Sequence, residues 1–199
     1  MRYLALALAL ACGGEGTAET VENVNPEPAP SPSEPEPPAS APTLDAIPAA
    51  SLGRARVAEP FLEQGFTYPM RNLEAGFGKD GNLVLIELKP ETDGLSIQLT
   101  FHGPAALGTQ GYRVLPIAAD ESDVFTVALG RTNLRPGAGE VHVESVSDDA
   151  IVATLDLEVR HPMLPTPTQL RARIHARHDT YYDAAIRHEQ AIREQLKRR

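Results

Sequence analysis

The chain has 199 residues with 18 Lys and Arg against 27 Asp and Glu, a formal net charge of -9, and only one cysteine. This length predicts one domain of ordinary size with additional segments. A single cysteine excludes an intramolecular disulfide and any multi-cysteine zinc or iron–sulfur site. The acidic balance argues against nucleic acid as a partner, and no apolar run approaches the roughly 20 residues of a membrane-spanning helix.

The chain begins MRYLALALALAC, with one positive charge at Arg2 and an uninterrupted run of leucine and alanine before Cys12. This start resembles the signal peptide of bacterial lipoproteins. The resemblance implies that residues 1–11 are removed and that Cys12 becomes a lipidated N-terminus, which anchors the protein to a membrane of the cell envelope. Gly13, the residue after the cysteine, is compatible with sorting to the outer membrane, facing the periplasm or the cell surface.

Two alternatives for this start stay open. Cleavage after Ala9-Leu10-Ala11, an A-x-A site, gives ordinary secretion with a free thiol on Cys12. The other alternative is a cytosolic protein whose first residues are apolar by chance. The position of the cysteine favours lipidation, because it is the only cysteine of the chain and stands directly after the apolar run.

Residues 13–48 carry seven acids and no base, and proline alternates with other residues in NPEPAPSPSEPEPP. Few apolar side chains are present to offset the entropy of ordering the backbone. We therefore expect residues 12–49 to form a disordered acidic tether, which proline and like charges keep extended. A docking role for a proline-recognising domain is less favoured, because the basic flank typical of such ligands is missing.

The body, residues 50–165, shows the period-two alternation of half-buried strands. Apolar and polar residues alternate from Leu95 to Phe101 and again from Ile151 to Val159. Further strands are predicted at 83–89, 112–117, 124–129 and 141–146. Turn sequences separate them at 79–82, 91–94, 120–123, 136–139 and 147–149. The predicted fold is mainly β: a small antiparallel β-sandwich or barrel.

The last segment, residues 166–199, is predicted to be a long basic amphipathic helix. Thr166 and Gln169 fit a capping box, and Pro167 suits the first helical position. Apolar residues follow at steps of three and four, at Leu170, Ile174, Tyr181, Ala185, Ile192 and Leu196. Such a helix is about 45 Å long, so its far end is expected to project beyond a small β domain.

Eight Lys and Arg stand against four acids in this segment, whereas the tether and the body are acidic. The positive charge predicts an interaction surface for an acidic envelope protein or an anionic envelope surface. Its members are Arg173, Arg177, Tyr181, Arg187 and Arg193. The alternative is that the apolar stripe packs on the β domain and the arginines are its solvated face.

Sites for metals and cofactors are weakly indicated. His175, His178 and Asp179 have a spacing that can hold zinc or copper on a helix, but no second element supplies an obvious further ligand, so we predict no metal. The acidic turn 120–123 is a weak calcium candidate. The G-x-G-x-x-G pattern at 76–81 is followed by a predicted strand and not a helix, which favours a hairpin turn over a dinucleotide site.

Nucleophilic catalysis has little support, because the chain has no G-x-S-x-G elbow and no internal cysteine. We assign no catalytic residue and no cofactor.

The favoured function is non-enzymatic binding or scaffolding at the cell envelope, through the C-terminal helix or the loop 102–110. One alternative is a hydrolase or metal-dependent enzyme built on the β-domain loops, which three or more titratable groups in one pocket would favour. The other is a structural protein that assembles through the helix.

Overall fold

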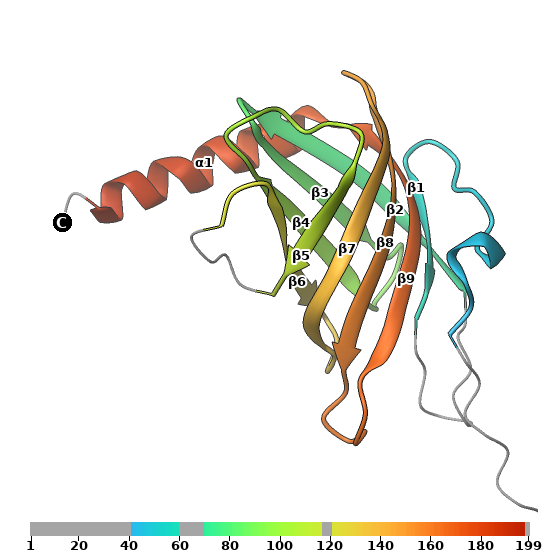
Figure 1. Cartoon of the computed structure of the whole chain (residues 1–199). Helices are drawn as coiled ribbons and strands as arrows, with labels where there is room; N and C mark the ends of the chain where they lie inside the picture. Colours follow the sequence, from blue (N-terminus) through green and yellow to red (C-terminus); the bar gives the residue numbers. More distant parts are fainter. Residues whose placement is uncertain (1–40, 60–69, 117–120, 198–199) are drawn as a thin grey trace, which may run out of the picture. The chain divides into compact units, whose positions relative to one another are not determined.

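The computed structural model of the protein describes residues 41–59, 70–116 and 121–197 (Figure 1). In these ranges a short 3-10 helix is followed by nine strands and one α-helix. In chain order they are η1 (Leu44–Ala46), β1 (Arg54–Ala58), β2 (Met70–Asp80), β3 (Leu83–Lys89), β4 (Ser96–His102), β5 (Gly111–Leu115), β6 (Val124–Gly130), β7 (Arg135–Val146), β8 (Ala150–Arg160), β9 (Thr168–His178) and α1 (Thr180–Lys197). The predicted signal peptide 1–11, Cys12 and the tether up to residue 40 lie outside the described residues.

The nine strands form one closed barrel in the order β1-β2-β3-β4-β6-β5-β7-β8-β9. The barrel closes where β1 pairs antiparallel with β9, with Arg54 opposite His175. All neighbours in this order are antiparallel except β5 and β6, which run parallel. The prediction of a mainly β fold, a barrel with a C-terminal helix, is confirmed.

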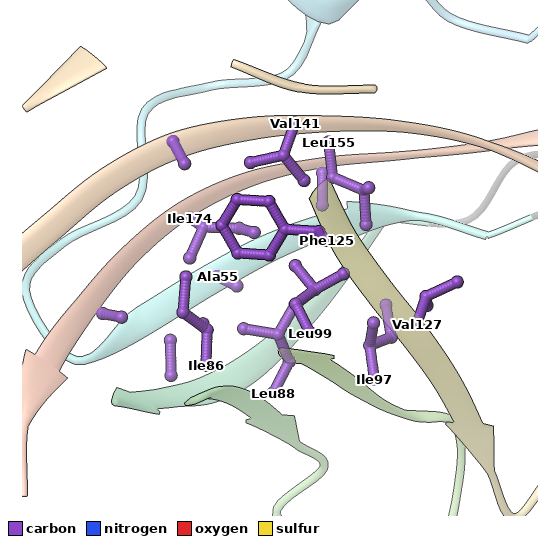
Figure 2. Packing of buried hydrophobic residues seen from close by; sticks show 14 of the residues in the cluster. Ala55, Ile86, Leu88, Ile97, Leu99, Phe125, Val127, Val141, Leu155 and Ile174 are labelled. Atoms are coloured by element: carbon purple, nitrogen blue, oxygen red, sulfur yellow. The ribbon is translucent and has the colours of Figure 1, made fainter. Parts of the chain in front are cut away.

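The period-two alternation fills the barrel interior with apolar side chains. On β4, Ile97, Leu99 and Phe101 point inward and are at most 1 % exposed, while the polar residues between them face outward. Figure 2 shows Phe125 among aliphatic side chains contributed by strands all around the barrel. Its ring centroid lies 5.4 Å from that of Phe101 and 5.7 Å from that of Tyr112. This interior is a packed core, held together by burial of apolar surface.

The predicted helix over 166–199 is wrong in its first half, because residues 168–178 form β9 and the helix begins only at Thr180. Leu170 and Ile174 alone fit the spacing of four that is typical of a helix. Together with Ala172 and Ala176 they form a row in which every second residue is apolar, as in a strand. All four side chains are at most 1 % exposed, inside the barrel. The predicted domain boundary at 165/166 is wrong for the same reason, since β9 pairs with both β8 and β1.

One predicted turn is also wrong, whereas two others are confirmed. Residues 136–139 lie inside β7, where the register against β8 shifts between Pro136 and Gly139, as in a β-bulge. Gly139 lies close to the β8 backbone, so that an added Cβ would lie 2.9 Å from Cα of Leu157. The hairpins at 79–82 and 147–149 are present, and Gly81 adopts the positive φ of +60° that favours glycine.

The end of the predicted disordered tether is ordered, which corrects the prediction for residues 41–49. Residues 42–50, which we call the N-terminal strap, are held by side chains on the outer face of β9. Arg171 donates to the carbonyl oxygen of Pro42 at 2.7 Å, and Arg173 donates to that of Leu44 at 3.0 Å. Ile47 in the strap is 1 % exposed. An apolar anchor and charged donors to main-chain carbonyls together offset the cost of ordering this segment.

Arg173→Ala should release the middle of the strap, because Arg173 also reaches the carboxylate of Asp45 at 3.3 Å. We expect the free energy of unfolding to fall by about 1–2 kcal/mol, the range for a hydrogen bond from a charged donor. Hydrogen exchange of the amides of residues 44–50 should speed up. Arg160→Ala, at an exposed arginine that contacts Glu158, is the control. Equal protection of the strap in wild type and Arg173→Ala would show that these contacts do not hold it.

Candidate functional site

The helix α1 packs against the outer face of β2 and β3, and Figure 1 shows its C-terminal end extending beyond the strands. Tyr182 and Ile186 form a small apolar cluster with Leu85 of β3, outside the barrel. Two glycines of β2 let the first turn of the helix approach the sheet. A Cβ added to Gly78 would lie 2.5 Å from the backbone N of Asp183, and Gly76 lies directly under the ring of Tyr182.

Polar contacts fix the start of the helix on the barrel. One carboxylate oxygen of Asp183 accepts the backbone N–H of Lys79 at 2.8 Å. The Nε2 atom of His178 lies 3.1 Å from both oxygens of the same carboxylate. Burial alone raises the pKa of Asp183, but the Lys79 amide and His178 outweigh it and hold this pKa below its ordinary value. The charged form of Asp183 therefore stabilises the docked helix.

Asp183→Asn should lower stability at neutral pH, by about 1–2 kcal/mol for the weakened charge-assisted hydrogen bonds. A carboxyl whose pKa is lowered by folding contributes stability above its ordinary value of 3.8 and loses it as pH falls through the lower folded value. The difference between wild type and Asp183→Asn should therefore shrink as the pH is lowered below about 4. Urea denaturation between pH 7 and pH 2 measures it. Asp93→Asn, at a fully exposed carboxylate, should show no such convergence.

A groove of about 420 Å³ lies between α1 and the outer face of the barrel. We call it the neutral groove, because none of the described side chains that line it is a carboxylate, an ammonium or a guanidinium. Its outward-facing polar residues come from alternate positions of β4 and from β6 and α1. It is lined by Leu83, Gln98, Thr100, His102, Pro116, Thr126, Val127, Ala128, Ile186 and Gln190.

Hydrogen bonds hold the sheet side of the neutral groove in place. The hydroxyl of Thr126 lies 3.2 Å from Nε2 of His102 and donates to the carbonyl oxygen of Thr100 at 3.4 Å. Within the described residues, the side chains of Gln98, Thr100 and Gln190 form no hydrogen bond. They leave donors and acceptors available to a molecule in the groove.

A second groove, of about 340 Å³, lies on the other side of the helix start. We call it the charged groove, because two arginines and two acids line it together with the ring of Tyr182. Its lining consists of Leu52, Gly53, Arg54, Glu74, Ala75, Gly76, Arg177, Asp179 and Tyr182. Arg54 is paired with Glu91 outside the groove. Burial raises the pKa of the Tyr182 hydroxyl, which keeps it protonated at neutral pH.

The three weak metal candidates are not brought together. His175 lies on the outer face of β9 beside the carbonyl oxygen of Ala50, whereas His178 contacts Asp183. Asp179 accepts the backbone N–H of Tyr181 at the start of α1. The described residues contain no group of three or more His, Cys, Asp or Glu side chains placed to hold a metal ion. The predicted calcium turn 120–123 is only partly described, and its Glu121 pairs with Arg113.

The predicted basic surface is divided between different parts of the fold. Arg173 binds the strap, and Arg177 lines the charged groove. Arg187 is exposed on α1, and Tyr181 is 65 % exposed, with the ammonium of Lys89 5.5 Å from its ring. The side chain of Arg193 lies outside the described residues. These side chains do not form one face of one helix, because two of them belong to β9.

The loop 102–110 is tied to the barrel at its C-terminal end. Leu107 is 8 % exposed, and the hydroxyl of Tyr112 accepts the backbone N–H of Gly108 at 2.8 Å. His102, at the start of the loop, lines the neutral groove. Sequence reasoning missed both grooves. The available signal was the outward row Gln98, Thr100 and His102 on one strand, which carries polar groups without a net charge.

The fold and the two grooves define a class of protein: a closed nine-stranded barrel with a packed interior, whose recesses lie outside it at the contact with α1. No family model, curated protein or solved structure matches the chain. None of the helices in the described part of the chain is both long and apolar enough to cross a membrane.

Proposed function

We propose that this protein is a lipid-anchored protein of the bacterial cell envelope with a non-enzymatic binding role. The anchor is lipid on Cys12, after removal of residues 1–11, and the location is the outer membrane, facing the periplasm or the cell surface. The apolar run directly before the only cysteine supports the anchor. The acidic proline-rich tether suits a spacer that holds the barrel away from the membrane.

The observation that carries the binding role is the neutral groove outside a filled barrel. Apolar side chains fill the interior between the described strands, and the recesses that this part of the chain offers to a ligand lie on the outer surface. The neutral groove has the size of a small-molecule site, roughly 300–1,000 Å³. Among the described residues, His102 is the one titratable side chain that lines it. Several uncharged donors and acceptors with an apolar flank suit recognition better than acid–base chemistry.

The anchor is tested by membrane fractionation and intact mass of the full chain expressed in a bacterial host, with Cys12→Ala beside the wild type. We expect the wild type in the membrane fraction, beginning at Cys12 and carrying the mass of acyl chains. Cys12→Ala should lose both properties. A wild type that stays out of the membrane fraction and retains Met1 would overturn the proposal.

The charged groove favours a second candidate function, a hydrolase on the outer surface. Arg54, Glu74, Arg177, Asp179 and Tyr182 bring more than three titratable groups to one recess. Under this alternative, Glu74 or Asp179 acts as a general base beside an arginine that binds an anionic substrate. The purified full chain should then hydrolyse members of a panel of aryl esters and phosphates, and one of the two variants Glu74→Gln and Asp179→Asn should abolish the activity. Absence of turnover across the panel favours the binding role.

A further inference from the structure

The neutral groove differs from the rest of the surface in the kind of polar groups it presents. Charged residues make up 23 % of the chain, yet among the described side chains that line this groove only the titratable His102 can carry a charge. Resting on the binding role proposed above, we infer that the neutral groove binds an uncharged acetamido sugar in a short oligosaccharide. The inference names the ligand class of that site.

The uncharged lining that the structure describes disfavours ionic ligands. A bound carboxylate, phosphate or ammonium group would lose part of its hydration between α1 and the barrel. The lining that the structure describes contains no oppositely charged side chain to compensate. An uncharged ligand avoids this cost, because hydroxyl and amide groups can exchange water for hydrogen bonds of similar strength.

The polar side chains match the groups that a sugar presents. Gln98 on β4 and Gln190 on α1 each offer an amide donor and acceptor. Thr100, two residues along β4 from Gln98, offers a hydroxyl. The hydroxyl of Thr126 is oriented by its contacts with His102 and with the Thr100 carbonyl, and it retains acceptor capacity. Dense hydroxyl and amide groups on a ligand would satisfy several of these side chains at once.

The apolar part of the lining points to the acetamido group. Leu83 and Ile186 flank the groove on the side of the helix, and both belong to the cluster that packs α1 on the barrel. A methyl group attached to an amide can contact such a flank while its amide N–H and C=O face the glutamines. A sugar with hydroxyl groups alone leaves this flank exposed to water.

The test is titration calorimetry of the full chain in detergent with N,N′-diacetylchitobiose. We expect saturable binding by the wild type. Thr126→Val and Gln98→Leu should each weaken it about fivefold or more, the loss of one hydrogen bond with an unsatisfied partner. Thr154→Val is the matched control, since Thr154 lies on β8, does not line the groove and, at 9 % exposed, accepts the same change of side chain away from it. Circular dichroism melting verifies that each variant is folded.

Three further outcomes decide the assignment. Weaker binding of cellobiose, which lacks the acetamido groups, and of the de-N-acetylated disaccharide, which is cationic, supports it. Equal binding of all three disaccharides, or equal affinity of wild type and Thr126→Val, overturns it. A neutral dipeptide amide that binds where the sugar does not also overturns it. A wild type that fractionates with the membrane through Cys12 but binds no sugar leaves the envelope proposal standing and removes only this inference.

Discussion

Phe125→Ala should lower the free energy of unfolding by about 3–5 kcal/mol, the range for removing a buried phenylalanine. The side chain is 0 % exposed and packs against two further aromatic rings inside the barrel, those of Phe101 and Tyr112. The closed hydrogen-bonded wall limits how far the strands can move inward, so most of the cavity should persist. Equilibrium denaturation in urea measures the loss.

Two further substitutions calibrate this result. Phe125→Leu keeps most of the apolar volume and should cost clearly less than Phe125→Ala. Val146→Ala removes methyl groups from a side chain that is 39 % exposed and should change stability by no more than about 0.5 kcal/mol. A loss below 1 kcal/mol for Phe125→Ala would contradict the packed interior described here.

Gly78→Ala should cost about 2–3 kcal/mol, because the new methyl group meets backbone and not a flexible side chain. The added Cβ would lie 2.5 Å from both the N atom of Asp183 and the carbonyl carbon of Tyr182. A rotamer change cannot relieve this contact, so the first turn of α1 has to move away from β2. The movement separates Tyr182 and Ile186 from Leu85, and it stretches the hydrogen bond from Lys79 to Asp183.

The barrel itself should survive this substitution, since Gly78 faces outward and the interior is unchanged. Hydrogen exchange should therefore show faster exchange in α1, with protection in β4 and β8 retained. Gly108→Ala is the control, because its added Cβ lies at an ordinary contact distance of 3.5 Å from the Tyr112 hydroxyl. Unchanged exchange in α1 of Gly78→Ala would be evidence against the close contact between helix and strand.

The strands that alternate strictly were the easiest to predict from sequence. In β4 large apolar residues occupy every second position, and in β8 Ala153 is the one small residue of the inward row, so a period of two is the clear interpretation of both segments. β9 was missed because its inward residues alternate between large and small. Leu170 and Ile174 alone fit one face of a helix, and the intervening alanines carry little hydrophobic signal. Pairing with β8 on one side and with β1, more than a hundred residues earlier, on the other makes this segment a strand.

The candidate site was less predictable than the fold, because it depends on where α1 lies. Gly76 and Gly78 were predicted to belong to a hairpin turn, but they lie within β2, where the first turn of α1 packs on them. This contact cannot be read from the glycine pattern without knowing the position of the helix. The neutral groove combines Gln98 and Thr126 from two strands with Gln190 from α1. No spacing within the sequence relates these positions. The order of the N-terminal strap could not be predicted for the same reason, because arginines of β9 hold it in place.

The closure of the barrel by β1 and β9 also sets the order of events in folding. Arg54 and His175 are partners across the seam, so the first and last strands of the chain have to meet before the interior is sealed. Contacts between residues so far apart in sequence make a topology slow to fold, because a long loop must close before the contacts form. During synthesis, β1 emerges first and has no completed partner on that side until residues 168–178 appear. A chain truncated within β9 would therefore expose both an open sheet edge and the apolar interior, and it would be prone to aggregate.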